Sequence, residues 1–326
     1  MDSDDLRGQA LARSSRLARS SPLACSQRLT RSSPLACPSP LARSLGLARS
    51  LVVSLALLAA ACGPNRTVPP RPIWSGDAGV SVPLGCVPNL DGRIEAAELM
   101  PAYDVGASFL LAPAGELREV LTAGVPSPDG TLRWDLGADY ASDVVARFGA
   151  QRVAGAWFAA SFPSAQFAVA DDPTGALLAV YRLETTGLFL LGFASREMDP
   201  PEGRTLWVYQ TPVLVFQLPL EPGASWVTVS EVRDATVRGV PYAGRDSYES
   251  RVQAPAGELV LPDLRFAQAM RVSTHATLEP SAGAAIHRRQ SSWLFECFGE
   301  VARVVAPEGE SRDDFTTAAS MRRFGL

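Results

Sequence analysis

The side chains that could carry out acid–base or metal chemistry are few in this chain. It has two histidines, His275 within RVSTHATL and His287 within AAIHRRQ. Neither has a second His, Cys or carboxylate at the sequence spacing of metal ligands, so the sequence predicts no metal centre built on them. We find no G-x-S-x-G, H-E-x-x-H or C-x-x-C motif and no phosphate-binding glycine loop. An enzyme is therefore not the favoured interpretation.

A hydrolase with a dispersed site stays open as a third hypothesis, because a Ser–His–acid triad is recognised by its geometry and not by its order in the chain. His275 is the histidine that such a site would use. Two acidic pairs, Asp171-Asp172 and Asp313-Asp314, flank expected turns. Neighbouring side chains of a strand point to opposite sides, so these pairs are interpreted as solvated loop residues and not as catalytic carboxylates.

The strongest chemical signal is the hydrophobic run that ends at Cys62. Residues Leu51 to Ala61 are apolar except for Ser54, follow Arg49 and end in three alanines. As a helix this run would span about 16 Å, well short of a hydrocarbon core of roughly 30 Å. A short apolar core behind basic residues and before small residues is typical of a secretory signal and its cleavage site.

The segment from Leu58 to Cys62, LAAAC, resembles a bacterial lipobox, although Ala59 stands where that family usually has Leu. The resemblance implies cleavage before Cys62, a diacylglycerol on its thiol and an acyl chain on its amine. Gly63 replaces the Asp that retains enteric lipoproteins in the inner membrane, which implies attachment to the outer membrane, on its periplasmic or its surface face. An ordinary secretory signal with a chance cysteine is the alternative.

The chain divides by composition into four parts. Residues 1–61 form a leader, in which RSSPLAC occurs at 19–25 and again at 31–37 without packable periodicity. Residues 62–85 are rich in Pro and Gly and form the expected lipid-anchored tether. A turn-helix segment at 86–104 precedes the body at 105–326, and we leave open a division of the body at about residue 200.

The charge distribution excludes a class of partner. The chain contains Arg but no Lys, and residues 62–326 hold 22 Arg and 31 acidic residues, a net charge of −9. A nucleic-acid-binding protein needs a basic face to neutralise phosphates. The charge therefore predicts no nucleic-acid partner. The lipobox resemblance implies the membrane as a partner, reached through the N-terminal lipid, and a protein or apolar ligand that the sequence does not identify is also expected.

Cys86 and Cys297 are the cysteines left in the exported part once Cys62 is acylated, and we predict that they form a disulfide. The periplasm is oxidising, and closing a loop of about 210 residues would restrict the unfolded chain by roughly 5 kcal/mol in the entropy model. Alternation in SSWLFECFGEVARVV places Cys297 on the core side of a strand. A free buried thiol at Cys297 and an unrelated linker cysteine at Cys86 are the alternative.

The segment VPNLDGRIEAAEL, residues 87 to 99, is similar to the loop of an EF-hand. The resemblance implies a weak calcium site whose ligands are Asn89, Asp91, the Arg93 carbonyl and Glu98. Val87 stands where the family has its first Asp, and the preceding helix is missing. The alternative is a plain Asn-Leu-Asp-Gly turn followed by a short helix. No other cofactor is expected.

The sequence of the body predicts a mainly β fold: an antiparallel sheet, sandwich or curved half-barrel with few short helices. Apolar runs rich in Val, Phe, Trp, Tyr and Thr recur from residue 106 onward, with turns between them roughly every ten residues. Val153–Phe162 and Ser292–Val305 are examples of the expected strands. Helix is expected only over Ala138–Phe148 and Ile94–Met100.

The second half of the body, about 205–326, has the strand rhythm PVLVFQLPLEPGASW, AGELVLP and CFGEVARVV. This order is similar to the curved sheets of the LolA/LolB-like half-barrel group of envelope proteins, which implies a carrier or binder of an apolar ligand. The leading hypothesis is broader: a lipid-anchored protein of the cell envelope with a binding or structural role and no chemistry of its own.

Overall fold

The structure, a computed structural model, describes residues 85–325. The leader at 1–61, the acylation candidate Cys62 and the tether up to residue 84 lie outside the described residues. The described residues belong to one compact unit. Within the described part the helical elements are two short 3-10 helices, η3 (Ala96–Leu99) and η4 (Ala159–Ser161). None of the described helices is long and apolar enough to cross a membrane.

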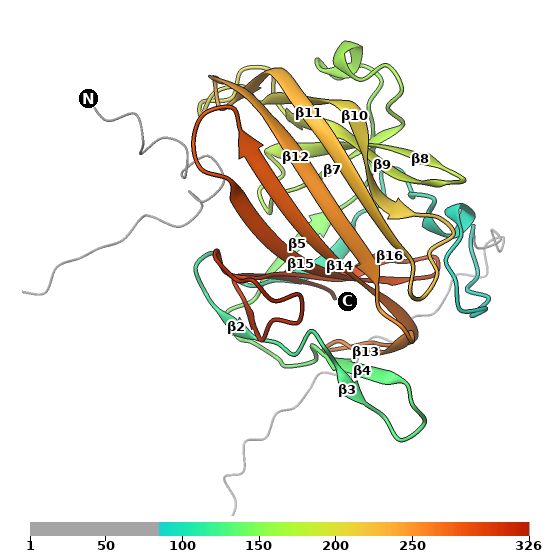
Figure 1. Cartoon of the computed structure of the whole chain (residues 1–326). Helices are drawn as coiled ribbons and strands as arrows, with labels where there is room; N and C mark the ends of the chain where they lie inside the picture. The colour runs from blue at the N-terminus through green and yellow to red at the C-terminus, as the bar shows by residue number, and fades with distance from the viewer. Residues whose placement is uncertain (1–84, 326) are drawn as a thin grey trace, which may run out of the picture. The chain divides into compact units, whose positions relative to one another are not determined.

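The body is one large sheet of sixteen strands with a two-stranded ladder beside it (Figure 1). The strands are β1 (Ala107–Leu111), β2 (Arg118–Glu119), β3 (Val125–Pro126), β4 (Leu132–Asp135), β5 (Val144–Phe148), β6 (Gln151–Arg152), β7 (Phe167–Ala170), β8 (Leu177–Glu184), β9 (Gly187–Ser195), β10 (Leu206–Gln217), β11 (Ser225–Val237), β12 (Val240–Val252), β13 (Gly257–Val260), β14 (Arg265–Pro280), β15 (Ile286–Phe295), β16 (Gly299–Val305), β17 (Thr317–Ala318) and β18 (Ser320–Phe324).

The main path runs β5-β1-β18-β16-β15-β14-β12-β11-β10-β9-β8-β7-β6, and every pair along it is antiparallel. The sheet is not closed into a barrel. These findings confirm the predicted fold class. Strands from both halves of the body lie in this one sheet, since β1 from the first half pairs with β18 from the second.

Long hairpins made of alternating residues build the middle of the sheet. In β11 the even-numbered residues Trp226, Ser230 and Val232 are buried, while the odd-numbered neighbours face solvent. The two-residue loop to β12 is Arg238-Gly239, and both residues have positive φ. That is the backbone of the tight turn that suits the right-handed twist of paired strands. β12, β14 and β15 continue the ladder beside β11 (Figure 1).

The core lies on both faces of the sheet around β14 to β16. On one face Trp293 packs against Trp134 of β4, and their ring centroids are 6.2 Å apart. Strands β4 and β13 cover this face. On the other face the next residue, Leu294, packs with Met270 and Phe216. This face is the inner one, because its cluster also takes in side chains from β7 and β8 near the far end of the strand path.

Three local expectations were wrong. Ala138–Phe148 is not a helix, because its second half is the edge strand β5 and pairs with β1. Val153–Phe162 is not a strand: it forms turns and η4 and packs its rings over the outer face of β8 and β9.

Ser292–Val305 is not one continuous strand, because β15 ends at Phe295 and a turn at Cys297, with φ of +66°, leads into β16. Cys297 therefore lies in a hairpin turn and not on the core side of a strand. The helix expected over Ile94–Met100 is present in part, as η3.

Candidate functional site

The polar face of β11, β12, β14 and β15 is where the fold gathers side chains that could do chemistry. Direct cross-strand neighbours in an antiparallel sheet project to the same side. One row across the four strands reads Val227, Glu249, His275 and Arg289, and the adjacent row reads Ser225, Arg251, Ser273 and Ser291. Residues from both rows, together with Asp313, line an open hollow of about 420 Å³.

His275 stands in the middle of this face with a carboxylate on one side and a hydroxyl on the other. Its Nδ1 lies 4.0 Å from Oε2 of Glu249, and its Nε2 lies 3.4 Å from Oγ1 of Thr277. Burial lowers the pKa of His275, the charge of Arg289 lowers it further, and Glu249 acts in the opposite direction. His275 is therefore a neutral imidazole at neutral pH, available as an acceptor or a ligand.

The two histidines that look isolated in the sequence are neighbours in the structure. Thr277 pairs directly with His287 on β15, which places His287 diagonally across from His275. The ring centroids are 5.7 Å apart, with 29° between the planes, and Nδ1 of His287 lies 3.2 Å from Oγ1 of Thr277. Sequence spacing did not reveal this proximity, because cross-strand register brings together residues that are twelve positions apart.

The acidic pair Asp313-Asp314 holds a loop onto the same face. Arg271 is 1% exposed, and its guanidinium donates to Oδ1 of Asp314 at 2.7 Å, to the carbonyl of Asp313 at 2.9 Å and to Oγ of Ser291 at 3.1 Å. Arg289 forms an ion pair with the Asp313 carboxylate. Both carboxylates are exposed, and each forms an ion pair with an arginine of the sheet. These ion pairs attach the loop to the sheet.

The arrangement can bind a ligand, and the hydroxyl that contacts both histidines is that of Thr277. Among residues 85–325, no serine hydroxyl forms a hydrogen bond with either histidine, and Ser273 instead donates to the carbonyl of Arg251 at 3.4 Å. Arg251 is exposed, and its guanidinium has no partner in the described part of the chain. The sequence could have revealed Glu249 and Arg289 as members of this face only if the strand register had been known.

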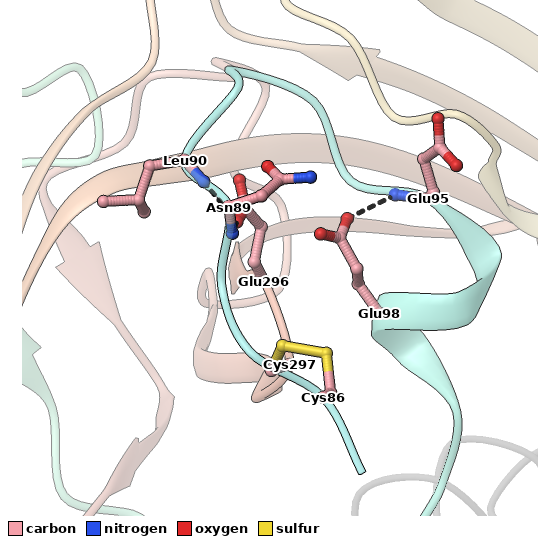
Figure 2. Close-up of a disulfide and its surroundings, with 7 residues drawn as sticks. All are labelled: Cys86, Asn89, Leu90, Glu95, Glu98, Glu296 and Cys297. Atoms are coloured by element: carbon pink, nitrogen blue, oxygen red, sulfur yellow. Dashed lines mark hydrogen bonds between the residues drawn. A yellow bond between two sulfur atoms is a disulfide. The ribbon is translucent and has the colours of Figure 1, made fainter. Parts of the chain in front are cut away.

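The predicted disulfide is present, and its surroundings form a second cluster of interest (Figure 2). Cys86 and Cys297 are 211 positions apart, with their Cα atoms at 5.6 Å. Oε2 of Glu296, a residue that is 3% exposed, accepts hydrogen bonds from the backbone N–H groups of Asn89 and Leu90, both at 2.7 Å. The amide of Cys297 donates to the carbonyl of Glu98 at 3.0 Å. The segment 86–104 is thus fastened to the β15–β16 turn by one disulfide and three hydrogen bonds.

The residues proposed as calcium ligands are used locally in this structure. Oδ1 of Asn89 accepts from the amide of Asp91, and Oδ1 of Asp91 accepts from the amide of Arg93. Glu98 points its Oε2 back to the amide of Glu95, at 2.8 Å, and so caps η3 (Figure 2). In residues 85–325 no three or more His, Cys, Asp or Glu side chains form a group that could hold a metal ion. The turn and the short helix are both present, and calcium binding stays a prediction.

The inner face of the sheet carries an ion cluster between its apolar clusters. Glu300 forms ion pairs with Arg303 at 2.7 Å and with Arg322, whose guanidinium also lies 5.0 Å from the ring centroid of Phe148. Burial acts to raise the pKa of Glu300, but the charges of Arg303 and Arg322 outweigh burial and hold that pKa at about 2. A ligand taken up at this face would therefore meet charged as well as apolar groups.

A buried carboxylate lies farther along the inner face, at Asp246 of β12. Asp246 is 0% exposed, and its Oδ2 accepts from the hydroxyl of Tyr209 at 2.9 Å, while Tyr209 and Tyr248 share a hydrogen bond of 2.7 Å. Its Oδ1 is buried without a partner. Burial raises the pKa of Asp246 to about 6. Sequence reasoning missed this group because nothing in RDSYES marks which acidic residue is covered.

Comparison with known proteins gives this chain no relative: no family model, no curated protein and no solved structure matches it.

Proposed function

We propose that this chain is an exported, lipid-anchored protein of the cell envelope whose β body serves a binding or structural role at the outer membrane. The observation that carries the proposal is the Cys86–Cys297 disulfide, because disulfides form and persist in oxidising compartments such as the periplasm. The short apolar run before Cys62 supplies the export signal and the acylation site. Two or more acyl chains give stable membrane attachment, at about 0.8 kcal/mol per buried CH₂.

The position of the disulfide fits an anchored protein mechanically. Cys86 is the second described residue, so any pull transmitted along the preceding chain reaches the disulfide before the sheet. The disulfide transmits that force to the turn between β15 and β16. This turn is close to the part of the sheet where core clusters cover both faces. The body would therefore stay folded under tension from its anchor.

The inner face gives no specific support to the alternative of an apolar-ligand carrier, since Glu300, Arg303 and Arg322 lie on it. Native mass spectrometry after gentle extraction separates the two roles. A binding or structural body leaves a single apo mass, whereas a carrier retains a lipid-sized adduct.

The anchor is tested by metabolic labelling with palmitate in a Gram-negative host, followed by salt-washed membrane fractionation. We expect label in the wild-type protein and none in Cys62→Ser, which leaves the membrane fraction. Cys25→Ser is the matched control, because its cysteine lies in the leader and is removed with it. An unlabelled wild-type protein, together with a Cys62→Ser protein that stays in the washed membranes, would rule out lipid anchoring at this residue.

A further inference from the structure

We propose that His275 and His287 form a two-histidine site for a divalent transition-metal ion on the polar face of β14 and β15. They are the only histidines in 326 residues, and the register of one hairpin sets them diagonally across from each other. Imidazole nitrogen is a preferred ligand of copper, nickel and zinc. The inference does not depend on lipid anchoring.

The ring nitrogens converge on one point. Nε2 of His275 and Nδ1 of His287 both point to Oγ1 of Thr277, at 3.4 and 3.2 Å. An ion bound to both would need each nitrogen at roughly 2.0–2.1 Å. Rotation of the two rings about their side-chain bonds can supply that approach, because both histidines lie on the accessible face and the strand backbones stay paired.

Glu249 takes the place of an outer-shell partner. Metal-binding histidines usually give their second ring nitrogen to a carboxylate, which fixes the tautomer and the ring orientation. Oε2 of Glu249 faces Nδ1 of His275 at 4.0 Å, and a proton on Nδ1 leaves the lone pair of Nε2 directed toward Thr277 and His287. Glu249 is therefore a positioning residue in the proposed site.

The surrounding charges permit a cation. The groups that face His275 are Glu249, Arg289, His287 and Asp313. Arg289 is neutralised by its ion pair with Asp313, and Glu249 contributes a negative charge that no arginine of residues 85–325 pairs with.

Two protein ligands leave the rest of the coordination sphere to water, which can reach His275 from the open hollow that this residue lines. Affinity for such an incomplete nitrogen site should follow the general order in which copper(II) binds more tightly than nickel(II) or zinc(II). Calcium prefers oxygen ligands and is not expected to compete.

The experiment is calorimetric titration of the purified, folded full-length protein with copper(II), together with electron paramagnetic resonance of the bound ion. We expect one ion per chain and hyperfine structure from two nitrogens. His275→Ala and His287→Ala should each weaken binding at least tenfold, and Glu249→Gln roughly tenfold. Ser273→Ala, on the same strand face but outside the histidine pair, is the matched control and should bind as the wild type does.

Equal copper affinity in the wild type and in either histidine variant would overturn the proposal, as would a wild-type protein that binds no copper. Thermal melts without metal must coincide for the variants and the wild type. If one histidine variant melts earlier, His287→Gln or His275→Gln replaces it, since glutamine keeps a polar group on the strand and removes the imidazole.

Discussion

At the scale of single residues, the polar groups that matter most are those that the sheet covers. Asp246, Arg271 and Arg323 are each 1% exposed or less. Arg271 and Arg323 have carboxylate partners, but no cation pairs with Asp246 in the described part of the chain. A buried charge without an ionic partner lowers stability, and a raised pKa is how a carboxyl group responds.

Asp246 should therefore make folding stability fall as the pH rises through weakly acidic values. Its pKa is raised from 3.8 to about 6, so the folded state binds the proton more tightly than the unfolded state does. Stability is then greatest below the unfolded pKa and declines between pH 4 and 6, by up to about 3 kcal/mol for this group. Urea unfolding of Asp246→Asn across this range should show a flatter pH profile and higher stability at pH 7.

Asp199→Asn is the control for that comparison, because the side chain of Asp199 is 78% exposed. Its profile should follow the wild type. A profile for Asp246→Asn that is parallel to the wild type would mean that Asp246 ionises in the folded protein as easily as in the unfolded chain.

Residue identities revealed part of this chemistry in advance. The expectation of an oxidising compartment, together with two available cysteines, was enough to predict the Cys86–Cys297 pair. Three features could not be predicted. They are the proximity of His275 and His287, the burial of Asp246, and the ion pairs of Arg271 and Arg289 with the acidic loop. Each of these depends on which residues stand opposite each other in the ladder, and register is set by contacts between distant segments.

At the scale of elements, the segment 86–104 is joined to the β15–β16 turn by a disulfide and three hydrogen bonds. Alternation of apolar and polar residues suggested one strand through Cys297, because the pattern continues across the turn. The chain instead reverses there, with positive φ at Cys297 and Gly299. Glu296, which alternation assigns to solvent, is buried because it accepts two backbone hydrogen bonds from residues 89 and 90.

Removal of the disulfide should lower the stability of the whole body. The entropy model assigns a loop of about 210 residues roughly 5 kcal/mol, and measured values are commonly smaller, at about 2–4 kcal/mol. Urea unfolding of the double variant Cys86→Ser, Cys297→Ser should show a loss in this range. The wild-type protein under reducing conditions should behave like the double variant.

Thiol labelling of the denatured, unreduced protein checks the premise independently. In the exported wild-type protein neither Cys86 nor Cys297 should react, and both should react after reduction. Two reactive thiols before reduction would contradict the bond itself, whatever the unfolding data give.

At the scale of the whole described sheet, composition and turn spacing were sufficient to predict an antiparallel β body, since strand propensity and turn residues are local signals. They could not predict how the sheet curls. The path of strands begins at β5 and ends at β6, and these two are consecutive in the chain, separated by Gly149 and Ala150. The segment 144–152 thus pairs with β1 by its first half and with β7 by its second, and the sheet bends round until both of its ends lie on one segment.

Gly149 lies between β5 and β6, the two strands at the ends of the sheet, and the close packing of the backbone there requires a glycine. A Cβ atom there would lie 2.8 Å from the carbonyl oxygen of Val105 and 3.2 Å from the Cα of Gly106, both of which are backbone atoms that cannot rotate away. We expect Gly149→Ala to lower stability by about 1–3 kcal/mol, the usual range for overpacking. Amide hydrogen exchange should speed up in the β1–β5 and β6–β7 ladders together, because one displaced residue loosens both ends of the sheet.

Gly85→Ala is the matched control, because nothing lies within 4 Å of a Cβ at that position and its φ is not positive. It should leave urea unfolding and exchange rates unchanged. If Gly149→Ala is as well tolerated as Gly85→Ala, the two ends of the sheet are not held together at this segment. If exchange rises in only one of the two ladders, the bend at 149 separates two independent edges instead of joining them.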